Sequence, residues 1–124
     1  MKYKQMGRTG LKVSELCLGT ATFGSQVAEA DAINLLDAAL DAGINLFDTS
    51  TSYPPPDGKR SEEIIGKAFK NKRHSAILIT KVANRTGPGV NDIGLSRKHI
   101  METVEASLQR LQTDYIDLYC LHLP

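Results

Sequence analysis

The chain has 124 residues, and its 15 lysines and arginines nearly balance its 14 aspartates and glutamates, which leaves a net charge of +1. A chain of this length buries a real core as one domain, and a second domain is not expected. The near-neutral charge gives no electrostatic case for nucleic acid or an anionic membrane surface as a partner. No apolar run suits a signal peptide or a membrane span. We therefore expect a cytoplasmic protein that selects its partner with a pocket.

The first expected element is a β-hairpin, because residues 3–6 and 11–13 flank the turn sequence GRTG, and we expect it to plug one end of the structure. Downstream, four short apolar runs alternate with three helix-like stretches, which predicts a βαβαβαβ order. The runs span residues 14–19, 44–48, 76–81 and 115–122, and the helix-like stretches span 28–42, start at 61, and span 96–111.

The ends and faces of the helices carry local signals. Gly43 follows the first helix where a left-handed residue is expected, and Ser61 is a good N-cap for the second. The third helix places four apolar residues on one face, namely Ile100, Val104, Leu108 and Leu111. Each helix is therefore expected to pack one side against a sheet.

The alternation of strands and amphipathic helices predicts parallel pairing through right-handed crossovers, with strands covered on both faces. The nearly continuous apolar runs fit this arrangement. Cys17 and Cys120 lie inside two of these runs, without another Cys or His at metal-ligand spacing. We expect both to be buried, reduced thiols, and we expect no metal site.

Two long loops follow strand-like runs, at residues 49–60 and 82–96. In parallel α/β folds, ligands bind at this end of the strands. Residues 54–56 are three consecutive prolines, and two interpretations are open: a polyproline docking motif, or a stiff turn that shapes the mouth of a pocket. We favour the turn.

Four side chains with acid–base chemistry fall at this same end: Asp48, Tyr53, Lys81 and His122. A free tyrosine is a poor acid or base at neutral pH because its pKa is about 10. A lysine cation beside a phenol favours the ionised form, and a carboxylate beside the lysine keeps the ammonium charged. A histidine can hydrogen-bond a substrate carbonyl and orient it. Together these residues predict a site that handles protons.

Each of these residues also has a structural interpretation. An aspartate at a strand end often forms a turn, and Tyr53 before prolines usually packs on its own loop. Lys81 and His122 would then be ordinary strand ends. Their shared rim favours the functional interpretation. The other two histidines, His74 and His99, lack such placement and are expected to be solvated.

Longer segments around these residues resemble the aldo-keto reductases, a family with a (β/α)8 barrel and an Asp, Tyr, Lys and His tetrad. The segments are RTGLKVSELCLGTATFG, LDAGINLFDTSTSY, RSEEIIGKAF, LITKV and LSRKHIMETVEASLQRLQTDYIDLYCLHLP, which cover essentially the whole chain. The resemblance implies an oxidoreductase that reduces aldehydes or ketones to alcohols. In it, Tyr53 is the general acid, and Lys81 and Asp48 tune it. His122 orients the carbonyl.

The resemblance further implies that NADPH supplies the hydride, with NADH as the alternative, and that the substrate is a small carbonyl compound. Two additional sets of residues follow by the same analogy. They are cofactor-binding Gly19, Thr20 and Asp48, and a substrate pocket of Phe23, Tyr53 and His122.

A (β/α)8 barrel needs about 250 residues, whereas this sequence offers four strands and three crossovers. We therefore expect an α/β fold built from parallel (β/α) units. Residues 1–13 would form the hairpin plug, and residues 14–122 the first four strands of a TIM-type barrel with three helices. The open edges of strands one and four predict self-association or poor solubility.

The resemblance leaves two alternatives open. One is a non-catalytic subunit of the same fold that senses a cofactor or binds a partner, and the other is an inactive fragment of a longer enzyme. A Schiff-base aldolase could use Lys81, but it would leave Tyr53 and the flanking segments unexplained.

Overall fold

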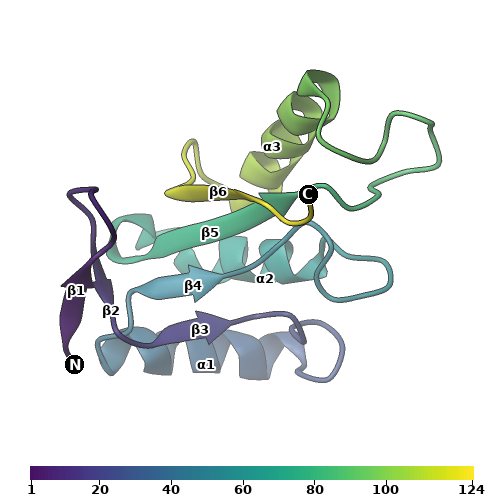
Figure 1. The fold of residues 1–124 in the computed structure, drawn as a ribbon. Coiled ribbons are helices and arrows are strands. Elements are labelled where there is room, and N and C mark those ends of the chain that lie inside the picture. Colours follow the sequence, from purple (N-terminus) through teal and green to yellow (C-terminus); the bar gives the residue numbers. More distant parts are fainter.

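A four-stranded parallel sheet forms the centre of the computed structural model, which describes residues 1–124 (Figure 1). The strands follow chain order and are β3 (Cys17–Gly19), β4 (Leu46–Asp48), β5 (Ile77–Val82) and β6 (Leu118–Leu121). The helices that connect them are α1 (Glu29–Asp41), α2 (Arg60–Phe69) and α3 (Arg97–Leu111), with a short 3₁₀ turn at Arg73–Ser75 before β5. This confirms the predicted α/β class and the βαβαβαβ order. None of the helices is long and apolar enough to cross a membrane.

The three helices cover one face of the sheet and leave the other open (Figure 1). Buried and half-buried residues alternate along β5, so that Thr80 faces the helices and Lys81 the open face. The expectation that both faces are covered is therefore wrong for this chain. Because one face is open, the prediction that both cysteines are buried is also wrong. Both are free thiols, but Cys17 is exposed and Cys120 is half-buried.

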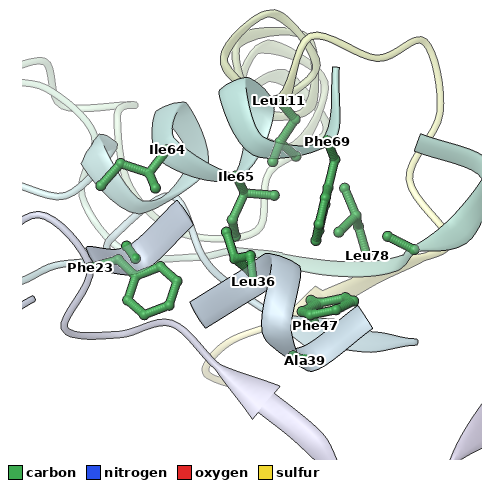
Figure 2. Close-up of a cluster of buried hydrophobic side chains, with 11 residues drawn as sticks. Phe23, Leu36, Ala39, Phe47, Ile64, Ile65, Phe69, Leu78 and Leu111 are labelled. Atoms are coloured by element: carbon green, nitrogen blue, oxygen red, sulfur yellow. The ribbon is translucent and has the colours of Figure 1, made fainter. Parts of the chain in front are cut away.

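The apolar core lies between the sheet and the helices (Figure 2). Phe47 of β4 packs edge-on against Phe69 of α2, with ring centroids 4.9 Å apart. Leu36 of α1 is fully buried in the same cluster. Burial of each such side chain stabilises the fold by about 1.5–3 kcal/mol. Gly66 brings α2 close to α3, because a Cβ there would collide with the Arg110 backbone.

The predicted hairpin is present as β1 (Tyr3–Gln5) and β2 (Lys12–Ser14), at the end of the sheet opposite the loops that follow β4 and β5 (Figure 1). The Tyr3 hydroxyl donates a hydrogen bond to the Gly43 carbonyl at 2.7 Å. The Asn45 side chain accepts from the Ser14 backbone N–H at 2.8 Å. Gly43 ends α1 with φ of +92°, as its position predicted. The hairpin thus contacts the segment that leads into β4.

Two predictions about the helices were wrong. Ser61 is not an N-cap: α2 begins at Arg60, and Ser61 is fully buried in its first turn. The buried face of α3 is mainly polar, since it carries Thr103 and Ser107. Of the predicted aliphatic row only Leu111 is buried, and the other three residues are half-buried. His99 belongs to this face and is 1% exposed, not solvated, because it packs beneath the loop that follows β5.

A buried ion pair joins α2, α3 and β5 beneath the open face. The Glu62 carboxylate is completely buried; it accepts from Arg110 Nε at 2.6 Å and from the Thr80 hydroxyl at 2.5 Å. The Tyr119 hydroxyl of β6 is buried without a hydrogen-bond partner, and burial together with the Glu62 charge raises the pKa of Tyr119 to about 12. The pair therefore anchors the strand that carries Lys81.

We predict that Arg110→Ala lowers the free energy of unfolding by about 3–5 kcal/mol, because it leaves the Glu62 carboxylate buried without a cation. Urea unfolding measures the loss. Arg97→Ala, which removes an exposed arginine from the same helix, is the matched control and should change stability by less than about 0.5 kcal/mol. Equal stability of the two variants would show that Glu62 does not depend on the ion pair.

We also predict that the chain associates with a second copy of itself through the free edges of β3 and β6. Leu121 on β6 is 62% exposed, and Leu16, just before β3, is 56% exposed. Light scattering should give a mass above that of the monomer. Leu121→Lys should restore the monomer, whereas Leu35→Lys, at an exposed site on α1, should not. A monodisperse wild-type monomer would refute the prediction.

Candidate active site

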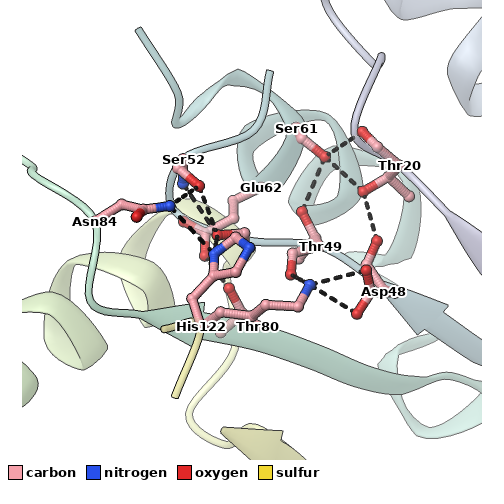
Figure 3. A network of polar contacts seen from close by, with 11 residues as sticks. Thr20, Asp48, Thr49, Ser52, Ser61, Glu62, Thr80, Asn84 and His122 are labelled. Atoms are coloured by element: carbon pink, nitrogen blue, oxygen red, sulfur yellow. Dashed lines mark hydrogen bonds and ion pairs between the residues drawn. The ribbon is translucent and has the colours of Figure 1, made fainter. Parts of the chain in front are cut away.

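An ion pair between β4 and β5 forms the base of the candidate site (Figure 3). Lys81 Nζ lies 2.8 Å from each carboxylate oxygen of Asp48 and donates to the Thr49 carbonyl at 2.7 Å. The Lys81 side chain is only 14% exposed. Because water is largely excluded, the carboxylate and the carbonyl replace it around the ammonium group. The positive charge is thereby fixed at one point of the open face.

Tyr53 and His122 complete the group of four predicted residues. The Tyr53 ring lies with its centroid 4.8 Å from Lys81 Nζ, and the His122 ring packs on Tyr53 edge to face at 5.8 Å. His122 follows β6, and its backbone N–H donates to the Val82 carbonyl at 2.8 Å. The parallel pairing of the sheet thus extends to His122 and brings all four side chains to one end of the strands.

Polar side chains that the sequence did not single out contact Nδ1 of the His122 ring. Nδ1 of His122 lies 3.2 Å from the Ser50 hydroxyl and 3.3 Å from the Asn84 amide nitrogen. Asn84 also donates to the Ser52 hydroxyl at 3.0 Å. Ser50 directly follows Asp48 and Thr49, so its place at a strand end was a usable signal. For Asn84 the sequence offered no signal beyond its position three residues after Lys81.

The environment of His122 favours its neutral form. Burial lowers the pKa of His122, the Lys81 charge lowers it further, and the Asp48 carboxylate opposes them. Together these effects place the pKa of His122 below the ordinary histidine value of 6.5. At neutral pH the ring is therefore an uncharged imidazole that offers one donor and one acceptor.

Of the residues predicted to bind the cofactor, Gly19 and Thr20 have different surroundings. A Cβ placed on Gly19 would meet no atom within 4 Å, so the sheet is open above it. Thr20 is fully buried; its hydroxyl donates to the Asp48 carbonyl at 2.9 Å and lies 2.7 Å from the Ser61 hydroxyl. The Thr20 side chain therefore fixes the strand ends and does not face the open sheet (Figure 3).

The structure does not support Phe23 as a residue of the substrate pocket. Phe23 is 2% exposed and belongs to the apolar core (Figure 2). The reason is the turn that follows it: Gly24 adopts φ of +90°, and Phe23 forms a bridge with Val27 that directs the ring inward.

A cavity of about 440 Å³ opens beside two of the four residues, Tyr53 and His122. Its lining comprises Ser52, Tyr53, Pro55, Pro56, Asn84, Arg85 and His122. Two of the three consecutive prolines therefore border the pocket, as the turn interpretation predicted. A larger cavity of about 790 Å³ lies between the carboxyl ends of α2 and α3 and contains none of the four residues.

Comparison with known proteins identifies the family. Residues 15–124 match the model of the aldo/keto reductase family. The chain belongs to the aldo/keto reductase family. A putative aldo-keto reductase of known structure from Pseudomonas aeruginosa superimposes with a TM-score of 0.84 at 37% identity, over 98% of this chain and 45% of that one. The fold of the four-stranded unit thus matches a part of this solved aldo-keto reductase.

Two curated relatives match this chain in sequence. An uncharacterized oxidoreductase, YrpG, of Bacillus subtilis is 45% identical over 130 residues, which are 98% of this chain and 40% of YrpG. A probable voltage-gated potassium channel subunit beta of Arabidopsis thaliana is 44% identical over 127 residues, which are 100% of this chain and 38% of that protein. The chain thus spans about two-fifths of the length of these two relatives.

We predict that Lys81→Met raises the pKa of His122. The substitution removes the charge that lowers this pKa and leaves the Asp48 carboxylate, which raises it, unpaired. An NMR titration of the imidazole measures the change. Lys67→Met, which removes an exposed lysine from α2, is the control and should leave the pKa unchanged. An unchanged or lower pKa in Lys81→Met would contradict the site geometry.

Proposed function

We propose that this chain carries the proton-transfer half of an NAD(P)H-dependent carbonyl reductase, with Tyr53 as the general acid. One observation carries the proposal: the Lys81 ammonium, held by Asp48 at 2.8 Å, lies 4.8 Å from the centroid of the Tyr53 ring, and Tyr53 lines a cavity. A fixed cation beside a phenol stabilises the phenolate that remains when the proton leaves. General acid catalysis of this kind contributes a factor of about 10²–10⁴ in rate.

His122 would orient the substrate carbonyl in this reaction. Its ring lies in the same cavity and packs against Tyr53 with ring planes at 89°. A neutral imidazole donates one hydrogen bond to a carbonyl oxygen without adding a charge. The oxygen would then lie between the Tyr53 hydroxyl, which supplies the proton, and the imidazole, which fixes its position.

The open face of the sheet fits the nicotinamide end of the cofactor. Gly19 has free space above it, and Asp48 and Lys81 lie on the neighbouring strands. A backbone without a side chain allows a flat ring to approach closely. The cofactor, NADPH or alternatively NADH, supplies a hydride to the carbonyl carbon when bound. Gly19, Asp48 and Lys81 would position the nicotinamide end of the cofactor, and the two charged side chains would balance the charge of that end. The substrates would be small aldehydes or ketones that fit a cavity of about 440 Å³.

A second candidate function is a subunit that binds the cofactor and reports its redox state to a partner protein. The observation that favours it is the 44% identity to a probable voltage-gated potassium channel subunit beta. A single slow oxidation of bound NADPH, with no steady-state turnover, would support this function over catalysis. Both candidates require the same cofactor site.

The proposal is tested with the purified chain, NADPH and a panel of small aldehydes and ketones. Nicotinamide fluorescence reports binding directly, since the protein has no tryptophan, and loss of NADPH reports turnover. We predict that Tyr53→Phe lowers turnover by a factor of about 10²–10⁴ and leaves NADPH binding unchanged.

Tyr115→Phe is the matched control, because Tyr115 is exposed and lies at the larger, distant cavity. It should behave as wild type. Turnover that survives Tyr53→Phe would remove Tyr53 from the mechanism. A folded chain that binds neither NADPH nor NADH would contradict the cofactor site itself.

A further inference from the structure

The polar contacts of the His122 ring all involve one of its two nitrogens, Nδ1. The reaction proposed above assigns these contacts no role. Nδ1 of His122 faces two side chains, the Asn84 amide at 3.3 Å and the Ser50 hydroxyl at 3.2 Å. These contacts come from the loops that follow β5 and β4. Both contacts lie on the Nδ1 side of the imidazole. Figure 3 shows Asn84 on that side, together with Ser52, to which the Asn84 amide donates.

The contact with Asn84 fixes the direction of the hydrogen bond. An amide nitrogen carries two protons and no acceptor site, so it can only donate. Nδ1 of His122 must therefore present a lone pair to it. A proton on Nδ1 would place two donors against each other at 3.3 Å. In a neutral imidazole the remaining proton then resides on Nε2.

The two serines are arranged consistently with this direction. The Asn84 amide donates to the Ser52 hydroxyl at 3.0 Å, and the Ser52 backbone N–H donates to the Ser50 hydroxyl oxygen at 3.2 Å. The Ser50 oxygen also lies 3.0 Å from the Ser52 hydroxyl. When the Ser52 hydroxyl donates in this contact, both acceptor sites of the Ser50 oxygen are occupied from Ser52, and the Ser50 proton is free to donate to Nδ1 of His122.

We propose that Asn84 is a positioning residue that, with Ser50, holds His122 in the neutral tautomer with its proton on Nε2. Nδ1 accepts from both side chains, and Nε2–H is the single donor of the ring. This inference assigns a function to a loop residue whose side chain hydrogen-bonds Ser52 and His122 and not Tyr53, Asp48 or Lys81.

The backbone before Asn84 supports a dedicated position. Ala83 adopts φ of +147°, a conformation that residues with a Cβ rarely take, and the Gly94 N–H donates to its carbonyl at 2.7 Å. Unusual backbone angles persist where the surrounding structure holds them, often at functional sites. The lowered pKa of His122 is consistent with a ring that stays uncharged.

The link to catalysis rests on the proposed function: Nε2–H would be the group that meets the substrate carbonyl. The proposed His122 tautomer depends on Asn84 and Ser50 and does not require bound substrate or cofactor. It can therefore be measured in the free chain, independently of any activity.

The test is a long-range proton–nitrogen NMR spectrum of the ¹⁵N-labelled chain at neutral pH. Comparison with His122→Gln assigns the His122 signals among the three histidines. The expected result is a protonated Nε2 and an unprotonated Nδ1. A protonated Nδ1 in the wild-type chain would overturn the proposal, whatever any variant does.

Asn84→Asp supplies the second measurement. A carboxylate at this position accepts instead of donating, so a proton should appear on Nδ1 of His122. Asn71→Asp makes the same charge change at an exposed site near the distant cavity and should leave the tautomer unchanged. The buried His99 reports in the same spectra whether the fold is intact.

Two results of these variants would count against Asn84. One is an Asn84→Asp spectrum that keeps the proton on Nε2 in a folded chain, and the other is an equal response to Asn71→Asp. If Asn84→Asp fails to fold, the wild-type spectrum still decides. A confirmed tautomer in a chain without reductase activity would refute the proposed function and leave this inference standing.

Discussion

The parallel register of the sheet is the constraint on which the site depends. Gly19 pairs with Asp48 across β3 and β4, and Lys81 pairs with Cys120 across β5 and β6, so that strand ends meet along one edge. The Lys81–Asp48 ion pair spans neighbouring strands of that edge. Beneath it, the buried Glu62 holds β5 against two helices. A shift of one residue along β5 would turn Lys81 toward the helices and abolish the site.

Much of this architecture could be predicted from the sequence, because its signals are local. Apolar runs separated by amphipathic stretches define the strands and helices, and Gly43 ends α1 where its left-handed conformation is needed. Parallel α/β topology then brings the strand ends together whatever their sequence separation. For this reason Asp48, Lys81 and His122 could be placed on a common rim before any contact was known.

What the sequence could not show depends on tertiary contacts. The polar face of α3 is buried because hydroxyl groups pair across elements, as Thr51 and Ser107 do at 3.1 Å, and helical periodicity counts only apolar residues. Phe23 was misplaced because the direction of its ring follows from the turn at Gly24. The exposure of Cys17 reflects a sheet with helices on one face. Asn84 became visible only through its contact with the His122 ring.

The measurement that tests the account most directly is a search for NMR cross-peaks between the ring protons of Tyr53 and His122 in the free chain. The account predicts them, since the ring centroids lie 5.8 Å apart. Cross-peaks between Phe47 and Phe69, whose centroids lie 4.9 Å apart, show that the core is formed. If those core cross-peaks are present and the Tyr53–His122 cross-peaks are absent, the side chains do not converge and the proposed site is wrong.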